Sequence, residues 1–124
     1  MKVSLITVTY NSATTLADTI QSVASQDYPN IEYIIIDGNS NDGTQEIIRS
    51  YLGTVSNYIS ESDAGLYDAM NKGIRMATGD VVGIINSDDF YHRPDAISKV
   101  VNAFQEFGCQ CVYGDVHFVR PDDL

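Results

Sequence analysis

The chain has 124 residues, and its 17 acidic and 7 basic side chains give a formal net charge of −10 at pH 7. This length fits one domain with a single hydrophobic core. The negative charge opposes binding along a nucleic-acid backbone or to an anionic membrane surface, so we expect no nucleic-acid partner. A phosphorylated ligand would be repelled as well, unless a cation neutralised it.

Two further features bear on the compartment of the protein. The apolar run Val3–Val8 gives way at once to polar residues, so it is too short for a signal-peptide core or a membrane span. We therefore predict a cytoplasmic protein, free or peripheral at the inner face of the cell membrane. Cys109 and Cys111 lie two residues apart in an apolar run, and this spacing favours buried free thiols over a disulfide or a metal site.

Strand and helix patterns alternate along the chain. A strand is predicted at Val3–Thr9, and apolar residues then recur at helical spacing over Leu16–Ala24. A second strand is predicted at Ile31–Asp37, followed by a helix that Asp42 would cap. The remaining predicted elements are a strand at Val55–Ser60, a helix at Leu66–Ala77, a strand at Val81–Ile85, a helix at Ile97–Phe104 and a strand at Cys111–Val119.

This alternation predicts an α/β fold, with a mostly parallel sheet and helices on both faces. Polar segments follow three of the strands, at Thr9–Asn11, Asp37–Ser40 and Asn86–Asp89. Ligands of open parallel sheets bind at the carboxyl ends of the strands, so we expect these segments to form one binding rim. Their aromatic, amide, hydroxyl and carboxylate groups suit a base, a ribose and a metal-bound diphosphate. The glycine-rich motifs of dinucleotide and P-loop sites do not occur.

The acidic pair Asp88–Asp89 is the most informative part of this rim. It follows Val81–Ile85, a run that predicts a strand buried on both faces. Paired carboxylates at that edge suit Mg²⁺ or Mn²⁺ held together with the phosphates of a nucleotide. The alternative is that the pair only makes a turn before Pro94.

Taken together, the motifs resemble those of the inverting glycosyltransferases of family two, which have a GT-A fold. The resemblance covers essentially the whole chain and rests on ordered motifs at Val3–Asn11, Ser22–Gln26, Ile36–Thr44, Asp63–Gly65, Asn71–Gly73, Thr78–Asp80 and Asn86–Asp89. It implies a Rossmann-like sheet and transfer of a sugar, with inversion, from a nucleotide-diphosphate sugar, expected to be a UDP-sugar, to an acceptor hydroxyl. Polysaccharide or glycolipid biosynthesis is the implied setting. Residues 1–124 would be one nucleotide-sugar-binding domain that stops before the acceptor region.

The resemblance also implies roles for residues of the nucleotide site. Thr9 and Tyr10 would border the base, with Tyr10 stacking on it and Asn11 beside them. The alternative for Tyr10 is that it only caps the sheet. Asp37 would accept a hydrogen bond from the uracil or the ribose.

The resemblance assigns the metal to the acidic pair. Asp89 would bind Mg²⁺ or Mn²⁺ directly, and Asp88 would contact the ribose or the metal. The catalytic base of the family lies in its acceptor half, and a turn explains Asp115 at least as well as a site does, so the base stays unassigned. The acceptor, a sugar or a lipid-linked molecule, is not identified.

Several residues near these motifs are open to a plain structural interpretation. Lys72 and Arg75 are expected on the solvated face of their helix, not in the site. Asp63 and Gly65 would either shape the donor pocket or make a loop turn.

Two functions from other classes stay open. One is a noncatalytic module that binds nucleotide sugars. The other is a response-regulator receiver domain, which lacks support because Thr9–Asn11 supplies no acids after the first strand and no lysine follows the fifth. An unpaired edge at Cys111–Val119 predicts a homo-oligomer.

Overall fold

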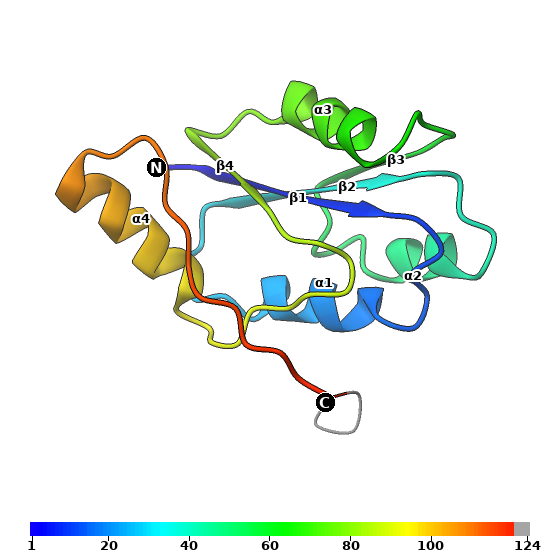
Figure 1. Ribbon diagram of the computed structural model, residues 1–124, viewed down its shortest axis with the longest axis horizontal. Coiled ribbons are helices and arrows are strands. Elements are labelled where there is room, and N and C mark those ends of the chain that lie inside the picture. The colour runs from blue at the N-terminus through cyan, green and yellow to red at the C-terminus, as the bar shows by residue number, and fades with distance from the viewer. Residues whose placement is uncertain (121–124) are drawn as a thin grey trace.

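The computed structural model describes residues 1–120, in which strands and helices alternate (Figure 1). This alternation confirms the predicted α/β class. The strands are β1 (Val3–Thr9), β2 (Ile31–Asp37), β3 (Asn57–Ser60) and β4 (Val81–Ile84). The helices are α1 (Leu16–Ala24), α2 (Thr44–Ser50), α3 (Leu66–Met76) and α4 (Ala96–Phe107).

The strands form one parallel sheet in the order β3-β2-β1-β4. Its register places Thr9, Asp37 and Ser60 in one row at the carboxyl ends of β1, β2 and β3. On the other side of β1, Ile84 pairs with Ile6, three positions before the end of that strand. The residues that follow Ile84 therefore lie beside the row of Thr9, Asp37 and Ser60, at the carboxyl edge of the sheet.

Helices α1, α2 and α4 cover one face of the sheet, and α3 covers the other (Figure 1). Leu5 and Ile35 belong to the core of the first face, whereas Ile6 and Ile34 belong to that of the second, as the two-residue period of a strand requires. The buried helix residues of the first face are Leu16, Ile20, Val23, Ile48, Ile97 and Val101. Burial of each large aliphatic side chain is worth about 1.5–3 kcal/mol.

On the second face, α3 lies very close to the sheet. A Cβ atom added to Gly73 would come within 2.6 Å of the Cγ2 atom of Ile6, which is itself fully buried. Ala69, one turn earlier on α3, is also fully buried. The small residues of α3 therefore set the distance between the helix and β1.

The prediction that β4 is buried on both faces is wrong. Val82 and Ile84 are 43% and 44% exposed. They pair with Ser4 and Ile6, so they lie on the face that α3 covers, but β4 is at the edge of the sheet. A helix is about 10 Å wide and spans about two strands, and α3 lies over β1 and β2. The outer strand of that face is left uncovered.

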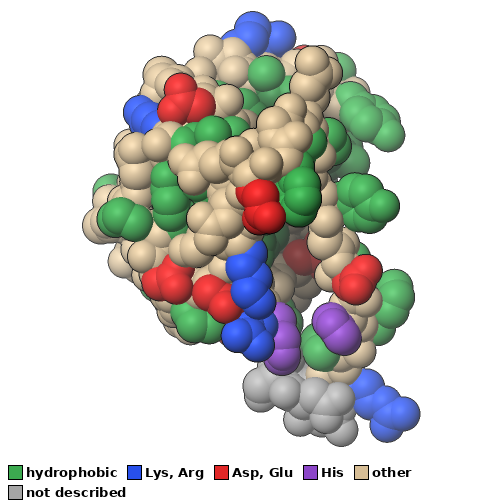
Figure 2. Space-filling view, turned by 90° about the vertical axis from the view of Figure 1, so that its left-hand side faces the viewer, with side chains coloured by type: hydrophobic (Ala, Val, Ile, Leu, Met, Phe, Trp, Pro, Cys, Tyr) green, Lys and Arg blue, Asp and Glu red, His purple; other side chains and the backbone are tan. Residues whose placement is uncertain are grey.

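The predicted fifth strand at Cys111–Val119 is also wrong, because no strand is formed there within residues 1–120. Tyr113 and Phe118 are almost fully exposed, so ordering of the segment is not offset by burial of its apolar side chains. Both cysteines are free, as predicted, but Cys111 is exposed and Cys109 is half-buried, so the prediction of buried thiols is wrong. Figure 2, which views the molecule from the left-hand side of Figure 1, shows hydrophobic side chains that project from the surface along one border of the view.

The N-terminus of α2 differs from the prediction as well. Gly43, with φ of 102°, occupies the capping position that we expected Asp42 to take. The Asp42 carboxylate instead accepts hydrogen bonds from the hydroxyl and the backbone N–H of Thr44, at 2.5 and 3.1 Å. The bond from that hydroxyl is the main reason why the pKa of Asp42 lies below its ordinary value. Asp42 thus stabilises the turn from one residue before the observed cap, Gly43.

Candidate functional site

Four loops leave the carboxyl edge of the sheet and form the candidate site. They are residues 10–15 after β1, 38–43 after β2, 61–65 after β3 and 85–95 after β4. The predicted site residues Thr9, Tyr10, Asn11, Asp37, Asp88 and Asp89 lie in these loops or at the strand ends that precede them. The parallel register brings them to one rim, as we expected.

The first two loops are joined by hydrogen bonds that run in both directions. The backbone N–H of Asn11 donates to the Ser40 hydroxyl at 2.8 Å, and the backbone N–H of Asn41 donates to the side-chain oxygen of Asn11 at 3.0 Å. The N–H of Ser12 donates to the Thr44 hydroxyl at 2.9 Å. Asn11 and Asn39 have φ of 48° and 66°. Asparagine tolerates this left-handed region better than most residues, so the sequence fits the shape of these loops.

Asp37 and Thr9, which we expected at the nucleotide, are both buried. The Asp37 carboxylate accepts hydrogen bonds from the Ser40 hydroxyl at 2.5 Å, the Ser40 N–H at 3.0 Å and the Ser60 hydroxyl at 2.6 Å. Asp37 therefore ties the loop after β2 to the end of β3. The Thr9 hydroxyl, in contrast, has no hydrogen-bond partner within residues 1–120. An unpaired buried hydroxyl is costly, and this one lies at the base of the rim.

Tyr10 is exposed and lies where three loops approach one another. It is 65% exposed. A Cβ atom added to Gly38 would lie 3.3 Å from Cδ2 of the Tyr10 ring and 3.1 Å from a carboxylate oxygen of Asp63. Gly38 thus leaves room for both side chains, and it brings Asp63, whose role the sequence left open, beside the ring. The role of Gly38 could not be predicted from the sequence, because its contacts with Tyr10 and Asp63 join three separate loops.

The acidic pair is exposed, as a ligand site requires. The backbone N–H of Asp89 donates to the carbonyl of Asn86 at 3.1 Å, so the pair does lie in a turn, and the amide of Asn86 also reaches the Asp89 carboxylate at 3.3 Å. A cavity of about 430 Å³ adjoins the pair. Its lining residues are Thr14, Thr15, Asp18, Asp88, Asp89, Phe90 and Val119.

The residues present fit one kind of metal site and not another. Within residues 1–120 no group of three or more His, Cys, Asp or Glu side chains could hold a metal ion. A cage built by the protein alone is thus not found in the described part of the chain. Mg²⁺ sites in nucleotide enzymes commonly use one or two carboxylates together with substrate phosphates. The exposed carboxylates of Asp88 and Asp89 fit that second arrangement.

Ser12 and Ser87 connect the first loop with the acidic loop. Their hydroxyls lie 2.9 Å apart, and the Ser12 hydroxyl also reaches the carbonyl of Tyr10 at 3.3 Å. Ser87 directly precedes Asp88. The sequence analysis assigned neither serine, because 75 positions separate the two.

The two cations that we placed outside the site behave differently. Arg75 is exposed, as expected. The Lys72 side chain is only 16% exposed, so its expected place on the solvated face is wrong. Its ammonium lies 3.1 Å from the Glu61 carboxylate and 3.7 Å from that of Asp68. The hydrogen bond to Glu61 is the main reason why the pKa of Lys72 is raised. Lys72 thus holds the loop after β3 against α3.

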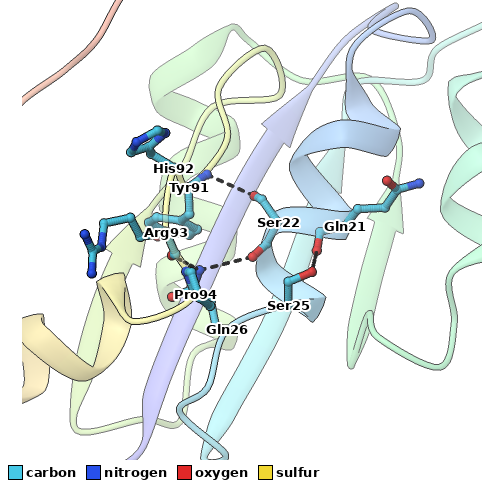
Figure 3. A pocket seen from close by; sticks show the side chains of 8 residues that line it. All are labelled: Gln21, Ser22, Ser25, Gln26, Tyr91, His92, Arg93 and Pro94. Carbon is cyan, nitrogen blue, oxygen red and sulfur yellow. Dashed lines mark hydrogen bonds between the residues drawn. The ribbon is translucent and has the colours of Figure 1, made fainter. Parts of the chain in front are cut away.

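A second cavity, of about 290 Å³, lies between the end of α1 and the loop after β4 (Figure 3). His92 lines this cavity, and the centroid of its ring lies 5.9 Å from that of the His117 ring. Figure 2 shows the two histidine side chains, in purple, near each other toward the lower end of the view. Tyr91 is largely buried beside the cavity, and burial raises its pKa to about 12. The residues that line the cavity are Gln21, Ser22, Ser25, Gln26, Tyr91, His92, Arg93 and Pro94.

Comparison with known proteins matches residues 4–124 to the family described as Glycosyl transferase family 2. A glycosyltransferase of Mycobacterium tuberculosis, itself uncharacterized, is 37% identical over 107 residues, which are 86% of this chain and 41% of that protein. A PGL/p-HBAD biosynthesis glycosyltransferase of Mycobacterium bovis is 32% identical, over 91% of this chain and 46% of its own length. The chain therefore spans less than half the length of these relatives.

Solved structures with the same fold are GT-A glycosyltransferases. The structure of TarS from S. aureus in complex with UDP-GlcNAc has a TM-score of 0.78 and 26% identity, over 86% of this chain and 32% of that one. The mannosyltransferase PcManGT from Pyrobaculum calidifontis, in complex with GDP-Man and Mn²⁺, has a TM-score of 0.77 and 28% identity, over 83% of this chain and 32% of that one. Among the described residues, none of the helices has both the length and the apolar character needed to cross a membrane.

Proposed function

Because the chain belongs to glycosyltransferase family 2, we propose that it binds the nucleotide-diphosphate sugar, a UDP-sugar, in an inverting sugar transfer to an acceptor hydroxyl. The observation that carries this proposal is the rim. It brings an exposed aromatic ring, Tyr10, to the same edge of the sheet as the exposed carboxylates of Asp88 and Asp89. The complexes of the two structural neighbours with UDP-GlcNAc and with GDP-Man and Mn²⁺ support it.

In this proposal, Tyr10 stacks on the base. Asn11 lies beside it, and its backbone is already held in place by Ser40. Because Thr9 and Asp37 are buried, they act from below: Asp37 holds the loop after β2, and the unpaired Thr9 hydroxyl offers a hydrogen bond at the base of the rim. A direct contact of Asp37 with uracil or ribose requires its bonds to Ser40 and Ser60 to rearrange.

Asp89 and Asp88 are proposed to hold Mg²⁺ or Mn²⁺ together with the diphosphate, with Asp88 also within reach of the ribose. The cation, when bound, would stabilise negative charge on the departing diphosphate. With a net charge of −10, the chain needs such neutralisation to hold a diphosphate at an acidic edge. The carboxylates orient the donor, and the Tyr10 ring fixes its base.

We assign no catalytic base to these residues. The acceptor, a sugar or a lipid-linked molecule, and the base are proposed to belong to the part of the family's sequence that this chain does not span. We propose a role in glycolipid or polysaccharide assembly on the cytoplasmic side of the membrane. The relative named for PGL/p-HBAD biosynthesis supports the biosynthetic part of this role. A second candidate is a noncatalytic nucleotide-sugar-binding module, because Tyr10, Asp88 and Asp89 at the rim are all proposed to bind the donor. The receiver-domain alternative does not agree with the family.

Calorimetric titration of UDP with Mn²⁺, and again with EDTA, tests the proposal. We expect binding with Mn²⁺ and strong weakening with EDTA. Asp89→Asn should lose the metal-dependent part, because it removes a ligand charge without changing the size of the side chain. Glu106→Gln is the matched control, since Glu106 is exposed in the last turn of α4, away from the rim, and should bind like the parent. Equal affinity with and without EDTA would contradict the metal assignment. Turnover of a UDP-sugar by a full-length relative carrying this rim separates an enzyme from a binding module.

A further inference from the structure

A row of polar side chains interrupts the apolar side of α1. Thr19 and Ser22 lie in the helix, and Gln26 lies just after its C-cap Ser25. Residues at this spacing share one side of a helix. Thr19 is fully buried among the apolar residues of the core, while Ser22 and Gln26 are half-buried. Polar groups in such positions need partners, and the site and the proposed function leave these three unexplained.

Each of the three has a partner in the loop that carries the acidic pair, and Gln26 also accepts a hydrogen bond from the backbone N–H of Ile97 in α4. The Thr19 hydroxyl shares its one hydrogen between the carbonyls of Asp89 and Ser87, at 2.5 and 3.1 Å. Farther along the loop, the Ser22 hydroxyl accepts from the backbone N–H of Tyr91 at 3.1 Å. The Gln26 amide donates to the carbonyl of Arg93 at 2.8 Å. Figure 3 shows these bonds of Ser22 and Gln26. Alternate residues of the loop are therefore hydrogen-bonded to α1 or to Gln26, which follows it.

The contacts of Thr19 lie on the peptide groups that flank the acidic pair. The carbonyl of Ser87 belongs to the peptide group before Asp88, and the carbonyl of Asp89 belongs to the peptide group after Asp89. One buried hydroxyl thus sets the orientation of the peptide groups on both sides of the two carboxylates. The Ser12 hydroxyl, 2.9 Å from that of Ser87, holds the same end of the loop from the other side. The carboxylates themselves stay exposed.

We propose that Thr19 is a positioning residue for the metal–diphosphate site, because its hydroxyl holds the backbone that aims Asp88 and Asp89. This inference rests on the proposed function. It predicts that Thr19 affects the metal-dependent part of nucleotide binding and leaves the contact with the base unchanged. Residues that orient metal ligands typically change metal affinity by about 10- to 100-fold when removed. Thr19 acts through backbone carbonyls, so we expect the lower end of that range, about tenfold.

The test compares Thr19→Val, which keeps the shape and removes the hydroxyl, with Thr19→Ser, which keeps the hydroxyl. The measured quantities are the Kd of Mn²⁺ at saturating UDP, the Kd of UDP in EDTA, and the Tm. Ser25→Ala is the matched control, because it also removes a hydroxyl next to α1, but one that only bonds to the Gln21 carbonyl. We expect Thr19→Val to weaken Mn²⁺ binding about tenfold without changing UDP binding in EDTA. Thr19→Ser and Ser25→Ala should bind Mn²⁺ like the parent.

Parent-like Mn²⁺ affinity in Thr19→Val would overturn this inference alone, and so would equal weakening of both Kd values, which would indicate a general role in folding. A parent chain that binds no Mn²⁺ with UDP would overturn the proposed function as well. If Thr19→Val does not unfold cooperatively, Ser12→Ala takes its place, since Ser12 holds the same end of the loop. Weaker Mn²⁺ binding in that variant, with unchanged UDP binding in EDTA, supports the inference, and parent-like Mn²⁺ binding refutes it.

Discussion

Gly73→Ala should destabilise the fold although alanine is the better helix former. In an exposed helix, replacing glycine by alanine gains about 0.8–1.0 kcal/mol. Here the new methyl group would lie 2.6, 3.1 and 3.3 Å from three carbon atoms of Ile6. Ile6 is fully buried in the middle of β1, so it has no free space into which to move. Overpacking of such a site costs about 1–3 kcal/mol, so the net loss lies between about 0 and 2 kcal/mol. The 2.6 Å contact with a fully buried side chain places the expected loss in the upper half of that range.

Chemical denaturation of Gly73→Ala beside Gly53→Ala measures this difference. Gly53 is the matched control, because a Cβ atom there would meet no atom within 4 Å and its φ is not positive. We expect Gly53→Ala to be neutral or more stable than the parent by about 0.4–1 kcal/mol. The midpoint should fall for Gly73→Ala with an unchanged m-value. A parent-like or higher midpoint for Gly73→Ala would refute the close approach of α3 to β1.

Tyr10→Ala should weaken UDP binding by about 1–3 kcal/mol, the typical contribution of base stacking on an aromatic ring, and should leave the Tm unchanged. Calorimetry measures the binding and a thermal scan measures the Tm. A large loss of Tm would show that the ring only caps the sheet. Gly38→Ala should also weaken UDP binding in the same titration, because the new methyl group would displace the Tyr10 ring or Asp63, whereas parent-like affinity would separate Gly38 from the site. Glu32→Gln should cost stability only at higher pH. Burial acts to raise the pKa of Glu32, but hydrogen bonds from Ser4 and Thr78 and the charge of Lys2 outweigh it and lower the pKa. The Tm difference between parent and variant should therefore be largest above about pH 5 and should shrink below about pH 4.3, and parallel curves would contradict this. Light scattering should give about twice the mass of one chain, because residues 111–119 expose their apolar side chains, and a monomer at high concentration would count against this.

All four strands of the sheet were predicted from the sequence, but the burial of β4 and the fifth strand were predicted wrongly, for a physical reason. The bounds of β1 and β2 agree with the prediction at every residue, since both strands are covered by helices and their apolar runs reflect that burial. The run at β4 is equally apolar, yet Val82 and Ile84 are exposed. Periodicity records the character of a side chain and not what covers it. The same limit explains why Cys111–Val119 has strand-like residues without forming a strand.

The candidate site was predictable where a side chain points away from the protein. Tyr10, Asp88 and Asp89 are exposed on the rim, as expected. The burial of Asp37 could not be foreseen, because one of its partners, Ser60, is 23 positions away. The role of Thr19 depends on carbonyls 68 and 70 positions away, and no local pattern encodes such a contact.

The hydrogen bonds between the loops after β1 and β2 limit how this rim can diversify. Each loop supplies side-chain acceptors for the backbone of the other, as the bonds between Asn11 and Ser40 and between Asn41 and Asn11 show. An insertion or deletion in one loop would leave donors of its neighbour unpaired, so the lengths of the two loops are coupled. Loops usually vary freely among homologues, but this pair should keep a constant length. Changes in sugar preference should therefore arise mainly in the loops after β3 and β4.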